Sequence, residues 1–300
     1  MPGLLLLRAR IARLPYRGAA RYWQARSLVV SFGLSVRRAN SCWQIGLLSG
    51  FLNTRRRIIL ETFVLVHGAW HDGSAWDPTV RHLESRGHRA FAPTMAGHGK
   101  SAPRNVNHAK CTESIARAIV DRSLRDIVLV GHSFGGTVVC KVAEAIPERI
   151  KRLVFLNAFV LEDGNSLVDE VPPAHAALYD ELSAKSGDGS MMIPFSIWRE
   201  SFVNDADIET AKWTYAQLSP EPYQPCKDKL DLKKFYSLQI PRSFINCTED
   251  TALPPGEWGW HPRMSSRLGL HRLVQMPGSH EVIYTNPTGL AEKIVEAGRD

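Results

Sequence analysis

A serine between two glycines is the residue of this chain whose setting most directly suggests chemistry. Ser133 lies at the centre of the segment 131–135, GHSFG, after the apolar run 128–130 and before a helical pattern that begins at Thr137. This is the G-x-S-x-G pattern in its strand-to-helix context, where a tight turn exposes the serine hydroxyl. Glycines at both ends let the strand and the helix approach closely. The spacing predicts that Ser133 is a nucleophile that attacks a carbonyl carbon.

Two later residues are placed to serve Ser133. A serine hydroxyl needs a base, and the base needs an acid that fixes its tautomer. His280 follows the last predicted strand in a Gly-Ser loop, and Asp250 follows the strand before it. Because the C-terminal ends of parallel strands share one edge of a sheet, both should meet Ser133. Glu249 is the rival acid, and Asp250 is preferred for its position ahead of the turn at 253–254.

A tetrahedral intermediate also needs N–H donors for its negative charge. The backbone N–H of Phe134, directly after the nucleophile, is the first candidate. The loop after the first predicted strand supplies the second, because its glycine-containing segment 67–69 lets the backbone approach the serine. We assign this donor to the N–H of Ala69, with Trp70 as the alternative.

Strands and helices alternate along most of residues 61–300. Short, continuously apolar runs are typical of strands buried on both faces, and alternation with helices of this length predicts a doubly wound, mostly parallel sheet. The expected strands cover residues 63–66, 88–93, 126–130, 153–156, 242–247 and 271–276. The expected helices cover residues 76–86, 112–123, 137–146, 256–268 and 287–297.

The alternation stops over residues 159–237, hereafter the cap segment. This segment lacks apolar strand runs and carries helical patterns and aromatic residues, so we expect a mostly helical cap over the C-terminal edge of the sheet, where ligands of open α/β sheets bind. Its aromatic residues either form a small core of their own or contact substrate. The candidate substrate contacts are Trp70, His71, His132, Trp198 and Trp213.

The basic character of the chain is confined to its beginning. The net charge is +7, but residues 1–60 hold 11 arginines and no acidic residue, so the remainder has 26 basic and 30 acidic side chains. We therefore expect no nucleic-acid surface on the folded body. Residues 1–60 suit an Arg-rich extension, either an organellar transit peptide or a misassigned start, and not a domain.

The composition also argues against several kinds of site. The five cysteines show no metal-binding or disulfide spacing, so we expect no metal and a reducing compartment. No run approaches the ~18 apolar residues of a membrane span. A cytoplasmic location follows, or an organellar one if residues 1–60 are a genuine transit peptide.

These motifs resemble those of the α/β-hydrolase superfamily over essentially all of residues 61–300. The segments 63–71, FVLVHGAWH, and 131–136, GHSFGG, are similar to those of plant methylesterases, hydroxynitrile lyases and related bacterial esterases. The resemblance implies the triad and the oxyanion donors given above, an acyl-enzyme mechanism and no cofactor. A homodimer is common in the group.

Two positions depart from the lyases of this group. Hydroxynitrile lyases place a threonine after the first-strand histidine and a lysine after the catalytic histidine. This chain has Gly68 and Glu281 at those two positions. A lysine would stabilise cyanide and a glutamate would repel it. Glu281 also differs from the apolar residue expected in the plant esterases, so their substrates do not carry over.

We therefore expect a serine hydrolase that cleaves a small carboxylic ester or lactone. The alternatives are a carbon–carbon lyase of the hydroxynitrile lyase type, a cofactor-free oxygenase, and a ligand receptor without catalysis on the same fold. Loss of a triad member would favour the receptor, but Ser133, Asp250 and His280 are all present.

Overall fold

The computed structural model describes residues 60–300, so the predictions for residues 1–59 lie outside the described part of the chain. Within it, six strands form one parallel sheet in the order β2-β1-β3-β4-β7-β8. The strands are β1 (Thr62–Val66), β2 (Arg89–Phe91), β3 (Ile127–His132), β4 (Ile150–Leu156), β7 (Arg242–Cys247) and β8 (His271–Met276). The predicted parallel α/β sheet is confirmed.

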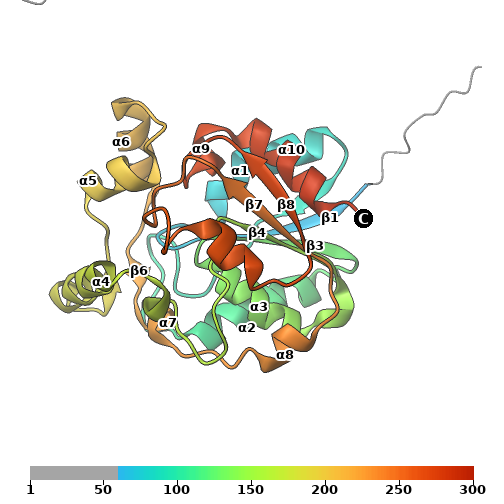
Figure 1. Cartoon of the computed structure of the whole chain (residues 1–300), viewed down its shortest axis with the longest axis horizontal. Helices are drawn as coiled ribbons and strands as arrows, with labels where there is room; N and C mark the ends of the chain where they lie inside the picture. Colours follow the sequence, from blue (N-terminus) through green and yellow to red (C-terminus); the bar gives the residue numbers. More distant parts are fainter. Residues whose placement is uncertain (1–59) are drawn as a thin grey trace, which may run out of the picture. The chain divides into compact units, whose positions relative to one another are not determined.

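Helices cover both faces of this sheet, because successive residues of a strand point to opposite faces. Phe63 and Leu65 belong to one hydrophobic core and Val64 and Val66 to the other. Figure 1 shows the two helical layers on either side of the strands. One layer comprises α1 (Asp77–Ser85), α9 (Val282–Thr285) and α10 (Pro287–Gly298), and the other comprises α2 (His108–Asp121), α3 (Gly135–Ala145) and α8 (Lys233–Ser237).

Local sequence explains the ends and faces of these helices. Asn107 caps α2 by accepting a hydrogen bond from the N–H of Lys110. The apolar residues Cys111, Ile115 and Ile119 of α2 repeat every four positions, so one stripe of the helix is buried. None of the helices described in residues 60–300 has the length and apolar character that a membrane span requires.

The cap segment connects β4 to β7 and extends to the left of the sheet in Figure 1. Besides helices, it contains a short antiparallel ladder in which Met191 of β5 pairs with Glu221 of β6. Its elements before α8 are η3 (Val168–Glu170), α4 (Pro173–Ser186), β5 (Ser190–Met191), α5 (Phe195–Ile197), η4 (Trp198–Phe202), α6 (Ile208–Gln217), β6 (Glu221–Pro222) and α7 (Gln224–Lys227).

The helix expected over 256–268 forms only in part. Helical turns cover residues 260–266, beginning with η5 (Trp260–Met264), and His261 within them has an extended backbone, with φ −118° and ψ 133°. Pro262 explains this, because the residue before a proline is driven out of the helical region. The remaining short turns are η1 (Gly73–Trp76) and η2 (Pro147–Arg149).

Candidate active site

Ser133 lies on a strained turn between β3 and α3. Its backbone is left-handed, with φ 52°, which is unusual for a residue with a side chain. A Cβ on Gly131 would lie 2.8 Å from the carbonyl oxygen of Gly135, and a Cβ on Gly135 would lie 2.5 Å from that of His67. Both positions therefore require glycine. Without side chains at these positions, β3 and α3 pack closely enough to hold Ser133 at the sheet edge.

Two backbone N–H groups beside Ser133 are free to bind a ligand. Within residues 60–300, neither the N–H of Phe134 nor that of Ala69 donates to another group of the chain, and both residues line the cavity that contains Ser133. The N–H of Trp70 donates to Glu221 Oε2 at 2.9 Å. Because Trp70 is engaged, the geometry favours Ala69 over Trp70 as the second oxyanion donor.

His280 and Asp250 form a buried pair. His280 Nδ1 lies 2.6 Å from Asp250 Oδ2, and both side chains are almost inaccessible to solvent. Burial alone would lower the pKa of His280, but the Asp250 carboxylate outweighs it and raises that pKa above the ordinary histidine value. Since Nδ1 donates to Asp250, Nε2 of His280 is left to exchange a proton within the cavity. Glu249, the rival acid, is exposed.

The Asp250 carboxylate is itself held by two donors. The amide of Asn157 donates to Oδ2, and the N–H of Ala252 donates to Oδ1 at 2.8 Å. Asn157 follows β4 directly, and its own Oδ1 accepts the N–H of Cys247 at 2.9 Å. The sequence analysis did not single out Asn157, although it is a polar residue directly after a strand, at the sheet edge where Ser133, Asp250 and His280 were expected.

Aromatic rings fix the plane of the His280 imidazole. Trp260 stacks on it with ring centroids 5.1 Å apart and an interplanar angle of 19°. Phe202 meets it edge-on at 5.3 Å, and His132 lies 4.7 Å away. These contacts hold the imidazole of His280 in one orientation.

A second group of ionisable side chains lies beneath His280. His132 is fully buried, which lowers its pKa to about 3, and its neutral Nε2–H donates to the carbonyl oxygen of His280 at 3.1 Å. Glu281 is equally buried, and its carboxylate lies 3.3 Å from Nε2 of His71. Burial would raise the pKa of Glu281, but His71 lowers it well below its usual range, so the carboxylate is anionic.

This group is also the nearest approach to a metal-ligand set. His132, His280 and Glu281 offer ligand atoms within 4.8 Å of one another among residues 60–300. However, Nδ1 of His280 is committed to Asp250, and the carboxylate of Glu281 faces His71. Each of these three side chains therefore already contacts another polar group of the chain.

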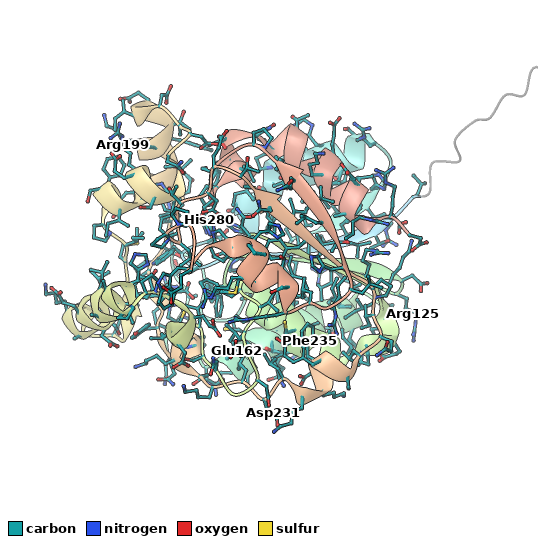
Figure 2. The ribbon with its side chains drawn as sticks, in the orientation of Figure 1. Arg125, Glu162, Arg199, Asp231, Phe235 and His280 are labelled. Carbon is teal, nitrogen blue, oxygen red and sulfur yellow. The ribbon has the colours of Figure 1, made fainter. Side chains whose placement is uncertain are left out.

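The cavity over Ser133 and His280 has mainly apolar walls. Figure 2 shows His280 between the sheet and the helices of the cap segment. The cap segment supplies one wall, and the loop after Asp250 supplies another. The lining residues besides Ala69, Phe134, Ser133 and His280 are Trp70, Phe159, Leu167, Tyr179, Met191, Phe202, Cys226, Ala252, Leu253 and Trp260.

Of the five candidate substrate contacts, the structure places one in the cavity lining and four outside it. Trp70 lines the cavity. Trp198 is fully buried behind it, stacked on Phe202 with centroids 5.5 Å apart. His71 and His132 lie beneath His280, outside the cavity lining. Trp213 is 54% exposed and contacts Tyr284, so it is not brought to the cavity.

Comparison with known proteins shows which family the chain resembles. Residues 63–293 match the alpha/beta hydrolase family. A carbendazim-hydrolyzing esterase of Nocardioides sp. (strain SG-4G) is 31% identical over 252 residues, covering 80% of this chain and all of the relative. An alpha-hydroxynitrile lyase of Arabidopsis thaliana is 28% identical over 262 residues, covering 79% of this chain and 97% of the relative.

A solved structure is also similar. It is an extracellular alpha/beta-hydrolase from a Paenibacillus species, described as sharing structural and functional homology with tobacco salicylic acid binding protein 2. It superposes with a TM-score of 0.79 at 44% identity and covers 80% of this chain and 100% of its own length. With the matching family span and the parallel sheet, these likenesses show that the chain belongs to the α/β-hydrolase family.

Proposed function

We propose that the protein is a serine hydrolase that cleaves a carboxylic ester through an acyl-enzyme intermediate. The observation that supports it most directly is the buried His280–Asp250 pair, 2.6 Å apart, beside a serine on a left-handed turn at the edge of the same cavity. Among relatives, the similarity to a carbendazim-hydrolyzing esterase supports the same class of reaction.

In this mechanism Ser133 Oγ bonds to the ester carbonyl carbon while its proton passes to Nε2 of His280. The carbonyl oxygen becomes an oxyanion and accepts the N–H groups of Phe134 and Ala69. The imidazolium then protonates the leaving alcohol, which departs and leaves an acyl group on Ser133. A water molecule, deprotonated by His280, repeats the addition, and release of the acid restores the serine. Asp250 keeps Nδ1–H of His280 in place throughout.

The cavity suggests an apolar acyl group. Phe159, Leu167, Met191 and Leu253 leave few polar partners for a substrate beyond the reacting atoms. A small aromatic or aliphatic ester or acyl lactone suits these walls, whereas a charged acyl group would lose its hydration without compensation.

The anionic side chain next to His280 opposes the lyase alternative. Glu281 is buried, and its pKa lies well below the usual range. Position 281 therefore carries no positive charge that could stabilise cyanide as it leaves a cyanohydrin.

The test is hydrolysis of a graded series of p-nitrophenyl esters and acyl lactones by the full chain and by Ser133→Ala. We expect turnover of apolar acyl groups and a loss of about 10³-fold or more in the variant. Equal activity in Ser133→Ala would refute the proposal. If neither protein hydrolyses any ester, cyanohydrin cleavage becomes the next assay.

A further inference from the structure

The peptide unit between Ala69 and Trp70 is held at both of its polar ends. The carbonyl oxygen of Ala69 accepts the Nδ1–H of His71 at 2.7 Å. The N–H of Trp70 donates to Oε2 of Glu221 at 2.9 Å. This peptide shares its Ala69 Cα with the N–H group assigned to the oxyanion. Its orientation therefore bears directly on where that donor points.

Trp70 has a backbone conformation that needs outside support. Its φ is 65°, in the left-handed region that a bulky side chain rarely occupies. The cap segment contacts every polar group of this residue. Besides Glu221 at the N–H, the N–H of Ser219 donates to the Trp70 carbonyl oxygen at 2.9 Å, and the indole N–H donates to the Met191 carbonyl oxygen at 3.1 Å.

Each end of the peptide is anchored through a buried carboxylate and a histidine. On the cap side, Glu221 lies 3.0 Å from Nε2 of His98, and neither side chain is accessible to solvent. Because Nδ1 of His98 faces the carbonyl oxygen of Ala96, both of its nitrogens face acceptors. Glu221 can therefore accept one hydrogen bond from His98 and a second from the N–H of Trp70.

On the opposite side, Glu281 anchors His71. Nδ1 of His71 faces the Ala69 carbonyl oxygen at 2.7 Å, and Nε2 lies 3.3 Å from the Glu281 carboxylate. Burial alone would lower the pKa of His71, but the carboxylate outweighs it and raises the pKa above the ordinary histidine value.

We propose that Glu221 and Glu281 are positioning residues of the oxyanion hole, which clamp the Ala69–Trp70 peptide from opposite sides and so aim the N–H of Ala69. The inference rests on the proposed function, since it assigns a role to that N–H. Glu221 belongs to β6 of the cap segment, so its hydrogen bond to Trp70 forms only when the cap segment packs against the sheet. The oxyanion hole is therefore complete only with the cap segment packed in this position.

Glu221 offers the sharper experiment, and the chain contains a matched control. Glu144 of α3 is also a buried carboxylate that accepts a backbone N–H, from Phe235 at 3.1 Å, and pairs with a cation, Lys141. It lies near the far end of α3 from Ser133. Glu221→Leu, Glu221→Gln and Glu144→Leu should be compared with the parent chain for kcat, KM and inhibition by an aryl trifluoromethyl ketone, which forms a tetrahedral adduct.

An oxyanion donor acts in the transition state, so its displacement should lower kcat and not substrate affinity. For Glu221→Leu we expect kcat to fall by about 10- to 100-fold, less than the full loss of a donor. KM should stay within about threefold, and the inhibition constant of the ketone should rise in step with the fall in kcat/KM. Glu221→Gln keeps one acceptor and should lose about three- to tenfold in kcat.

Three results would overturn the proposal: a folded Glu221→Leu with parental kcat, a loss confined to KM, or an equal loss of kcat in Glu144→Leu. Thermal melting identifies variants that do not fold. If Glu221→Leu is among them, Glu221→Gln decides, and parental kcat in that variant refutes the clamp. Failure of the proposed hydrolase is recognised separately, by undiminished turnover in Ser133→Ala.

Discussion

Gly68 packs against Ser133, and replacing it with alanine tests how rigidly this serine is held. An alanine Cβ would lie 2.9 Å from the Cβ of Ser133 and 3.1 Å from Nδ1 of His132. Carbon atoms separated by less than 3.0 Å repel strongly, so one side must move by several tenths of an ångström. Ser133 already occupies a left-handed turn, and His132 is buried and bonded to His280, so neither yields easily.

The expected loss follows from this displacement. A misplacement approaching 1 Å costs about 100-fold in rate, so we expect kcat of Gly68→Ala to fall about 10- to 100-fold, or about 1.4–2.8 kcal/mol of barrier. Overpacking should also cost about 1–3 kcal/mol of unfolding free energy. The assay is ester hydrolysis under saturating substrate, with urea denaturation alongside.

A control separates crowding at Ser133 from crowding in general. A Cβ on Gly298, at the end of α10, would lie 3.1 Å from Cε1 of Phe63 in the opposite core. Gly298→Ala should lose stability while keeping kcat. Parental kcat in a folded Gly68→Ala would show that the serine turn is not held as tightly as the geometry indicates.

Three further predictions address other parts of the site. Asn157→Leu removes the amide that binds Asp250 and leaves a buried N–H unsatisfied, so it should lose about 1–3 kcal/mol of stability by urea titration and about tenfold in kcat. Unchanged values would refute its role. Because the base must be neutral and the pKa of His280 is raised, kcat/KM should fall on the acid side with a midpoint above about 6.5, and a lower midpoint would contradict the pairing with Asp250. Trp213→Ala, at an exposed position, should leave KM within about twofold, whereas a large rise would bring Trp213 back into the substrate site.

The residues of the proposed triad were predictable because each lies within a few residues of the C-terminal end of a strand. Ser133 directly follows β3, whereas Asp250 and His280 lie in the loops after β7 and β8. The C-terminal ends of these parallel strands meet at one sheet edge. Asn157 obeys the same rule after β4, but an asparagine at such a place has many structural uses, so its type alone did not single it out.

The side chains that hold the Ala69–Trp70 peptide were not predictable in this way. Glu221 is 151 residues from Trp70 in the chain, and β6, to which it belongs, has only two residues. No periodicity marks so short a strand, and its contact with Trp70 arises only when the cap segment folds against the sheet. The choice between Ala69 and Trp70 depended on that contact. The helix expected at 256–268 is shortened for a local reason, since Pro262 drives His261 out of the helical region.

The most direct test of the account is to find the acyl group on Ser133. The full chain is mixed with a p-nitrophenyl ester, quenched in acid within the first turnovers, and digested for peptide mass spectrometry. The account predicts that the peptide containing Ser133 gains the mass of the acyl group and that the adduct and turnover both disappear in Ser133→Ala. Continued turnover by Ser133→Ala, or an acyl group found on another residue of the active parent chain, would contradict it.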